Sequence, residues 1–291
     1  MKDIETRSGK YEWIVIFTLI IASLPLILGF LLLILSSFSK EMVTNLDLSS
    51  FHFTLENWIN VFQGKLAITG GIRTNILRIT FNTLLVALGV AVVVTLISTL
   101  AGYSLSRMDF KGRKHMMILL LILHAFPGVA LIVGVYLLYL LTVPQGQGLD
   151  VVRLYSFFYV ILARAALEIP MSVWLMKGFF DTIPWEFEWS GIIDGASRIE
   201  VWWKIMLPLV KPGILAVALF AFLAGWQDII YVRTFLIDQT LATFIEANIE
   251  AEFSHMPLIA AAGTLYLLPT IIFFITAQQI LLQNYSGGIK G

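Results

Sequence analysis

The chain has 291 residues, of which 58% are hydrophobic and only 13% are charged. Soluble domains carry about 25% charged residues, and a chain of this length cannot form a core that buries so much apolar side chain. This composition excludes a soluble enzyme, a disordered scaffold and a secreted disulfide-rich domain, and it predicts a membrane protein. The absence of cysteine excludes disulfides, thiolate metal sites and cysteine nucleophiles.

Six stretches are long and apolar enough to cross a bilayer core about 30 Å thick. The first is charge-free from Trp13 to Leu35, too long for the apolar part of a cleaved signal peptide. The predicted spans are residues 13–35, 79–106, 116–141, 154–176, 212–236 and 257–282. The fold class is therefore an all-α integral membrane protein with six transmembrane helices, treated as one membrane domain.

The Lys and Arg residues divide unequally between the two sides of these spans. With the N-terminus inside, the inner segments carry most of them, including the basic loop Arg107, Lys111, Arg113 and Lys114. Because cytoplasmic loops are enriched in Lys and Arg, the N-in, C-in orientation is favoured. The segments are a cytosolic N-terminus (1–12), a first transmembrane helix (13–37), an extracellular segment (38–74), a membrane core with five helices (75–283) and a cytosolic tail (284–291).

The extracellular segment is too polar to span a membrane. Asn57, Trp58 and Phe62 predict a short interfacial helix within it, and glycines are expected to interrupt that helix. These glycines are Gly64, Gly70 and Gly71.

Residues 181–212, between the fourth and fifth spans, predict two short helices on the cytosolic side. For the first helix, Thr182 is a candidate cap and Pro184 suits an early position. Glu186 and Glu188 favour its positive end. The pair Asp194-Gly195 is expected to end it, because glycine adopts the left-handed conformation without strain.

The second helix of this stretch is expected to begin at a capping box formed by Ser197 and Glu200. Leu207-Pro208 is expected to end it, because a proline disfavours helical geometry in the residue before it. Small residues at the turn would let a soluble partner approach closely; these are Ser190, Gly191, Gly195 and Ala196. Two interpretations stay open from the residues alone: a docking hairpin that moves two spans, or an interfacial hairpin that only anchors the bundle.

The same stretch resembles the coupling loop of binding-protein-dependent ABC transporter permeases. The pattern of that loop is E-A-A-x-x-x-G, nine residues, then I-x-L-P. Gly195, Ile205 and Leu207-Pro208 match it at the right spacing, whereas Trp189 stands at the glutamate position. The string IPWEFEWSGIIDGAS resembles the maltose-type, carbohydrate-uptake branch in particular. Further strings that resemble this branch, in order, are AGYSLSRMDFKGRK, FPGVALIVGVYLL, AFLAGWQDII and GGIKG.

This resemblance implies the type I permease fold of ABC importers and a transport subunit that is not an enzyme. The implied substrate is a di- or oligosaccharide such as maltose or trehalose, and the implied location is a prokaryotic cell membrane. The implied partners are a second homologous permease, two ATPase subunits that hold ATP and Mg, and an extracellular solute-binding protein, with no cofactor on this chain. The implied ATPase-docking residues are Glu188, Trp189, Ser190, Gly191, Asp194, Gly195, Ala196, Ser197, Leu207 and Pro208. The outer loop 237–256 would contact the binding protein through Glu246, Glu250 and Glu252.

Charged residues inside the membrane are candidates for function. Arg164 and Glu168 are four apart and can pair on one helix face, either to hold the bundle together or to line the translocation pathway. Asp228, with Trp226 and Gln227, either lines that pathway or lies at the outer interface.

A second hypothesis uses the intramembrane charges Arg164, Glu168 and Asp228 for ion coupling in a stand-alone secondary transporter. The sequence has no inverted repeat to support it. No phosphate-binding G-x-x-x-x-G-K-[ST] motif occurs, so ATP must be hydrolysed elsewhere. The scattered histidines do not favour a metal site, and no basic patch favours nucleic acid.

Overall fold

The computed structural model describes residues 2–44, 51–63, 75–248 and 256–286. Within these ranges the chain is helical, and the only β pairing described is an isolated bridge between Ser39 and Phe53. The chain forms two compact units. One comprises residues 1–76 and 247–267, and the other comprises residues 77–246 and 268–291.

The first unit contains α1 (Lys2–Ser37) and the short helix α2 (Glu56–Gln63). The end of α1 is fixed to α2, because the side-chain amide of Asn57 donates to the carbonyls of Ser37 and Ser39 at 3.2 and 2.7 Å. The ring of Trp58 stacks on Phe38, with centroids 5.6 Å apart. The short helix predicted around Asn57 is confirmed, whereas Gly64, Gly70 and Gly71 lie outside the described residues.

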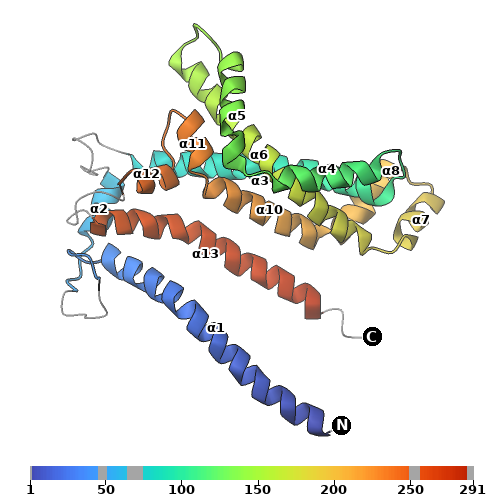
Figure 1. Cartoon of the computed structure of the whole chain (residues 1–291), viewed down its shortest axis with the longest axis horizontal. Helices are drawn as coiled ribbons and strands as arrows, with labels where there is room; N and C mark the ends of the chain where they lie inside the picture. Colours follow the sequence, from blue (N-terminus) through green and yellow to red (C-terminus); the bar gives the residue numbers. More distant parts are fainter. Residues whose placement is uncertain (1, 45–50, 64–74, 249–255, 287–291) are drawn as a thin grey trace. The chain divides into compact units, whose positions relative to one another are not determined.

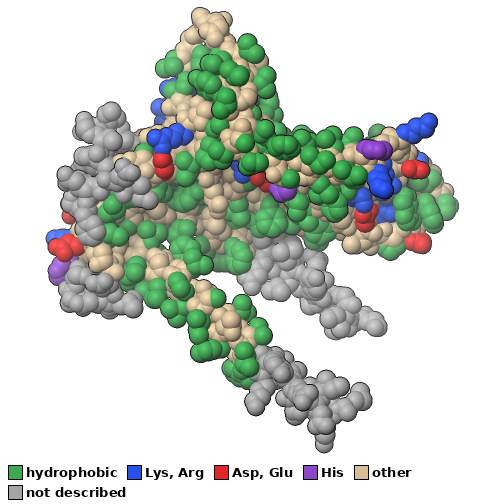
Figure 2. Space-filling view, in the orientation of Figure 1, with side chains coloured by type: hydrophobic (Ala, Val, Ile, Leu, Met, Phe, Trp, Pro, Cys, Tyr) green, Lys and Arg blue, Asp and Glu red, His purple; other side chains and the backbone are tan. Residues whose placement is uncertain are grey.

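The long helices agree with the predicted spans. In the part of the chain that the structure describes, four helical stretches are long and apolar enough to cross a membrane: residues 13–37 of α1, α3 (Ile76–Arg107), α6 (Leu149–Asp181) and residues 256–275 of α13 (Met256–Ser286). The count rises to six if each of two bent helix pairs is one span. These pairs are Arg113–Ala125 with Gly128–Thr142, and Arg198–Leu209 with Lys211–Trp226. Figure 2 shows apolar side chains spread over the surface of α1 and of the first bent pair, as expected for helices that face lipid.

The predicted third span is not one continuous helix. It consists of α4 (Arg113–Ala125) and α5 (Gly128–Thr142), whose axes differ by 96°. Figure 1 shows α5 turning away from α4 at this break. Pro127 explains the break, because it forces Phe126 out of helical geometry to φ −73° and ψ 128°. The proline therefore interrupts the helix instead of kinking it.

The predicted fifth span, 212–236, is also divided. The helix α10 (Lys211–Trp226) packs along α6, as Figure 1 shows, and it ends before Asp228. A separate short helix, α11 (Ile230–Phe235), follows. The Asp228 carboxylate accepts the backbone N–H groups of Tyr231 and Val232 at 2.9 and 3.0 Å. Because these N–H groups have no partner inside the helix, the aspartate starts α11. Its placement inside a continuous span was therefore wrong.

Candidate functional site

The stretch between α6 and α10 forms a helical hairpin. Its first arm is α7 (Glu186–Ile193), and its second arm is α8 (Arg198–Val201), a π-helical turn (Trp202–Met206) and α9 (Leu207–Leu209). The turn between the arms lies at Gly195, whose φ is +84°. This is the left-handed region that favours glycine, so the predicted end of the first helix at Asp194-Gly195 is confirmed.

The predicted capping box at the start of α8 is present in full. The backbone N–H of Glu200 donates to the Ser197 hydroxyl at 3.3 Å, and the backbone N–H of Ser197 donates to the Glu200 carboxylate at 2.9 Å. Lys204 also donates to this carboxylate, at 3.2 Å. The hydrogen bond from the Ser197 N–H has the largest effect, and the hydrogen bond from the Lys204 ammonium has the next largest. Both stabilise the charged carboxylate and lower the pKa of Glu200 to about 2.

Two details of the predicted hairpin were wrong. Thr182 does not cap α7, because its hydroxyl donates to the Phe179 carbonyl at 2.7 Å and so ends α6. Leu207-Pro208 does not end the second arm, which continues to Leu209. The π-helical turn before it widens the backbone, and Pro208 then lies in the first turn of α9, where its missing N–H costs no hydrogen bond.

The small residues of the hairpin have different environments. Gly191 is buried between the arms, and a Cβ there would lie 2.7 Å from the Ile205 side chain and 2.9 Å from that of Val201. Gly191 therefore lets the two arms pack together. Gly195 lies in open space at the turn. Of the other docking residues predicted, the exposed ones are Trp189, Ser190, Asp194, Ser197 and Pro208, the half-buried ones are Ala196 and Leu207, and Glu188 is buried.

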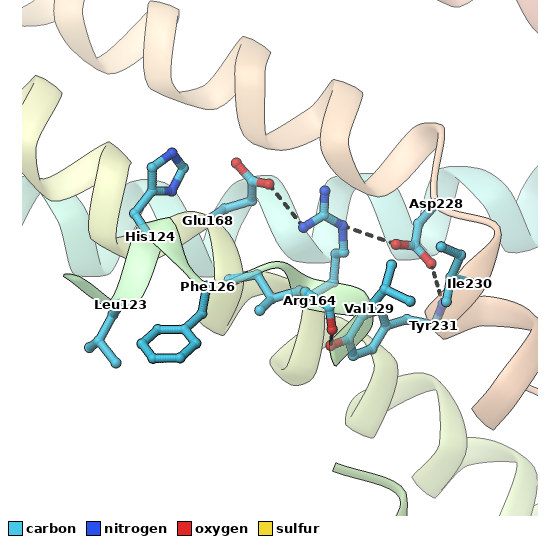
Figure 3. Close-up of a pocket in the computed structure, with 11 residues that line it drawn as sticks. Leu123, His124, Phe126, Val129, Arg164, Glu168, Asp228, Ile230 and Tyr231 are labelled. Atoms are coloured by element: carbon cyan, nitrogen blue, oxygen red, sulfur yellow. Dashed lines mark hydrogen bonds and ion pairs between the residues drawn. The ribbon is translucent and has the colours of Figure 1, made fainter. Parts of the chain in front are cut away.

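A second cluster brings together three of the residues predicted for the translocation pathway. Arg164 lies 2.9 Å from the Glu168 carboxylate on α6 and 3.0 Å from the Asp228 carboxylate after α10. The predicted pair of Arg164 and Glu168 is confirmed, and Asp228 joins it because α10 packs on α6. Figure 3 shows the guanidinium between the two carboxylates.

These three charged side chains line a pocket of about 290 Å³. They are partly accessible, since the exposed fractions of Arg164, Glu168 and Asp228 are 18%, 25% and 9%. The pocket presents a guanidinium donor, carboxylate acceptors and apolar walls; its remaining lining is Leu123, His124, Phe126, Gly128, Val129, Leu167, Ile230 and Tyr231. Within the described residues no group of three or more His, Asp or Glu can hold a metal ion.

The other two predicted pathway residues do not line this pocket. Trp226 is fully buried and stacks on Phe222, with centroids 5.6 Å apart, and Gln227 is exposed. His124 and Tyr231 do line it, although neither was predicted there. The spacing from Asp228 to Tyr231 is that of a helix-capping aspartate and a residue in the first turn, which could have indicated Tyr231.

The acidic outer loop is partly paired within the second unit. Asp238 lies 3.1 Å from Arg78 and 2.6 Å from Arg153, and Glu246 forms an ion pair with Arg233. Glu246 lies in the helix α12 (Leu241–Asn248). The two remaining acids predicted to contact a binding protein lie outside the described residues; they are Glu250 and Glu252.

Several apolar spans, a charged pocket along one of them and a helical hairpin between two of them define a multi-pass membrane transport subunit. Residues 95–287 match the family described as binding-protein-dependent transport system inner membrane component. The chain belongs to this family. Its members are the transport subunits of ABC importers, which work with separate ATPase subunits and a solute-binding protein.

Relatives of the chain include two permeases named for maltodextrin. It is 36% identical to the maltodextrin transport system permease protein MdxG of Bacillus subtilis over 72% of this chain and 74% of that protein. It is 32% identical to MalD of Streptococcus pneumoniae, also named for maltodextrin, over the same shares. It is 26% identical to the trehalose/maltose permease MalG of Thermococcus litoralis over 90% of this chain and 91% of that protein.

A solved structure shows the same fold. The match is to a bacterial ABC transporter involved in the import of the acidic polysaccharide alginate, with a TM-score of 0.66 and 17% identity. It covers 94% of this chain and 97% of the matched chain. The prediction of an ABC permease fold is therefore confirmed.

Proposed function

We propose that this chain is a membrane-spanning subunit of an ATP-driven importer for a di- or oligosaccharide of the maltose, maltodextrin or trehalose type. Relatives that align with most of the chain are named for these sugars. The observation that carries the proposal is the compact hairpin between α6 and α10, which offers a partner a firm point of attachment.

The hairpin is the docking site for an ATPase subunit that binds ATP and Mg. Its tip exposes large apolar side chains, with exposed fractions of 42% for Ile192, 83% for Ile193 and 78% for Ile199, together with Trp189. Burying such side chains against a partner is favourable. Closure of two ATPase subunits would push this tip, and α6 and α10 would move with it because they lead into the two arms. This role requires the hairpin, and hence both termini, to be cytosolic.

The pocket at Arg164, Glu168 and Asp228 is part of the sugar pathway, with a second homologous permease forming its other side. A sugar presents many hydroxyl groups, which both donate and accept hydrogen bonds. The guanidinium of Arg164 donates and the two carboxylates accept, so the pocket can exchange its internal ion pairs for hydrogen bonds to a passing sugar. On the outer side, the loop with Glu246 would contact the solute-binding protein.

Transport by the assembled complex in sealed proteoliposomes tests the proposal. The complex is reconstituted with its ATPase subunits and binding protein, and the uptake of labelled maltotriose and trehalose is measured with ATP inside, without ATP, and with an ionophore. We expect uptake of at least one sugar to require internal ATP and to resist the ionophore. Uptake that does not depend on ATP and is abolished by the ionophore would instead establish an ion-coupled transporter.

A further inference from the structure

The buried carboxylate of Glu188 joins the hairpin to a helix that is remote from it in sequence. Glu188 lies in the first turn of α7, and its side chain points toward the end of α3. The Tyr103 hydroxyl donates to this carboxylate at 2.9 Å. The Arg107 guanidinium lies 3.7 Å from its other oxygen. Tyr103 and Arg107 are four apart on α3, so one face of that helix meets the carboxylate twice.

Arg107 also binds the end of α6. Its guanidinium donates to the carbonyls of Phe180 and Ile183, at 2.8 and 2.5 Å. The Phe180 carbonyl, which also accepts the Ile183 N–H at 3.2 Å, lies in the last turn of α6, and Ile183 lies between α6 and α7. The guanidinium lies 4.5 Å from the ring centre of Trp185, at the start of α7. One side chain of α3 therefore contacts both the end of α6 and the first arm of the hairpin.

The charges of this cluster are withdrawn from solvent. The side chains of Arg107 and Glu188 are only 2% and 8% exposed. Within the described residues, the facing atoms Arg107 Nε and Glu188 Oε2 have no hydrogen-bond partner. Removing either partner would leave the other charge buried without its counter-ion, which is strongly unfavourable. The cluster therefore holds one arrangement of the three helices.

Two neighbouring contacts keep α3 and α6 together at the same end. A Cβ on Gly102 would lie 2.7 Å from the Cβ of Met176, so the two helices approach as closely as a glycine allows. The Ser106 hydroxyl donates to Asp181 at 2.6 Å, and Asp181 is also paired with Lys177. The end of α3 is thus tied both to α6 and to α7.

We infer that Arg107, Glu188 and Tyr103 form a latch that makes α3 move with the hairpin, so that force applied to the hairpin reaches a third transmembrane helix. This inference rests on the proposed function of the hairpin as the ATPase-docking site. The three residues are positioning residues, since they touch neither ATP nor sugar. The latch also assigns the Glu188 side chain to the contact with α3, so the surface offered to the ATPase carries the exposed Trp189 instead.

The test combines distance and transport measurements on the complete complex. Because the chain has no cysteine, spin labels can be attached to Leu100→Cys on α3 and Phe187→Cys on α7, both of which are exposed. The label distance is measured by pulsed electron resonance with ADP and after trapping with Mg-ATP and vanadate. With the latch intact, we expect the same narrow distance in both states. If the label distance differs between the ADP state and the trapped state in the protein without latch substitutions, the inference is overturned.

The latch variants are Glu188→Gln, Tyr103→Phe and Arg107→Met, and the matched control is Glu186→Gln, an exposed acid in the same turn of α7. We expect the latch variants to broaden the label distance and to lower maltotriose uptake per ATP hydrolysed by about tenfold, within the range typical of coupling between sites. The control should match the unaltered protein. The double variant Arg107→Met with Glu188→Leu should recover thermal stability without recovering coupling, because it strands no charge.

Failure of the latch and failure of the proposed function give different results. If the three latch variants keep both the narrow distance and the full uptake per ATP, the latch is refuted while the importer stands. If the unaltered complex does not retain its ATPase subunits or takes up sugar without ATP, the proposed function is refuted. A variant that loses stability and uptake together, but transports normally per folded complex, shows a structural role only and overturns the latch.

Discussion

The protein holds two clusters of charged residues that differ in their access to solvent. At the hairpin, Arg107 and Glu188 are 2% and 8% exposed and contact helix ends and aromatic rings. In the pocket, Arg164 and Glu168 are 18% and 25% exposed and line a space of about 290 Å³. A buried pair that is closed off by protein fixes the positions of helices, whereas a pair beside a pocket can exchange its partner for a ligand.

The two clusters also differ in how they are assembled. The hairpin cluster joins the end of α3 to α7 through Arg107 and Glu188, which are 81 positions apart in the sequence. The pocket cluster combines one pair within α6 with Asp228, an aspartate at a helix break that lies 64 positions after Arg164. In both clusters an arginine joins a local pair or helix end to a distant carboxylate. Substitutions that isolate each contact test whether this difference in access reflects a difference in role.

The largest effect is expected for Arg164→Met. This change leaves the carboxylates of Glu168 and Asp228 without their shared cation in a partly buried site, which should cost about 3–5 kcal/mol of stability. Thermal unfolding of the complex in detergent measures the loss. The control is the triple variant with Glu168→Gln and Asp228→Asn, which strands no charge and retains an oxygen that can accept the N–H of Tyr231. Equal losses in the single and triple variants would contradict a stabilising charge cluster.

A smaller effect is expected for Gly191→Val in the hairpin. The added side chain overlaps Ile205 and Val201, and such overpacking costs about 1–3 kcal/mol. Unfolding temperature and binding of the ATPase subunits are the measurements. Adding Ile205→Val removes the methyl group nearest to the new Cβ, so the double variant should recover part of the loss. If it recovers nothing, the two arms do not meet at Gly191 as described.

The hairpin turn gives a prediction about coupling. At Gly195, with φ +84°, an L-residue is expected to cost about 1–2 kcal/mol. Gly195→Trp also places a large ring at the proposed docking surface, so uptake should be lost while ATP hydrolysis and the spans persist. Gly148→Trp, on an exposed glycine with φ −62° and open space around its Cα, is the matched control. Normal uptake per ATP in the Gly195 variant would refute docking at this turn.

Local patterns predicted the parts of the fold that depend on neighbouring residues. Charge-free runs indicated the spans, and the Ser197–Glu200 spacing indicated the start of α8. The predicted span over residues 116–141 missed the helix break at Pro127, because hydropathy counts apolar residues across a bend as well as along a helix. The same property concealed the end of α10 before Asp228, because the apolar run continues into α11.

The contacts between distant segments could be predicted only in part. The pair of Arg164 and Glu168 follows from helical spacing, but the addition of Asp228 depends on how α10 packs against α6. The partner of Glu188 could not be read from its neighbours. Arg107 was counted with the basic loop that sets orientation, and the structure instead buries it in the last turn of α3. A single sequence records the charge of a side chain but not the long-range contacts that bury it.

The smallest effect is expected at the capping box, where the Glu200 side chain is exposed. Hydrogen bonds from Ser197 and Lys204 lower the folded-state pKa of Glu200 to about 2, from an ordinary value of 4.5. The contribution of the charged form is therefore complete above pH of about 4.5 and is lost as the pH falls toward about 2. Between these values the start of α8 should loosen progressively. Hydrogen exchange at the α8 amides, measured over that pH range, reports the change, and Glu200→Gln should remove its pH dependence while Glu186→Gln leaves it intact. An unchanged pH dependence in Glu200→Gln would assign the loosening to another carboxylate and would leave the box as a backbone cap only.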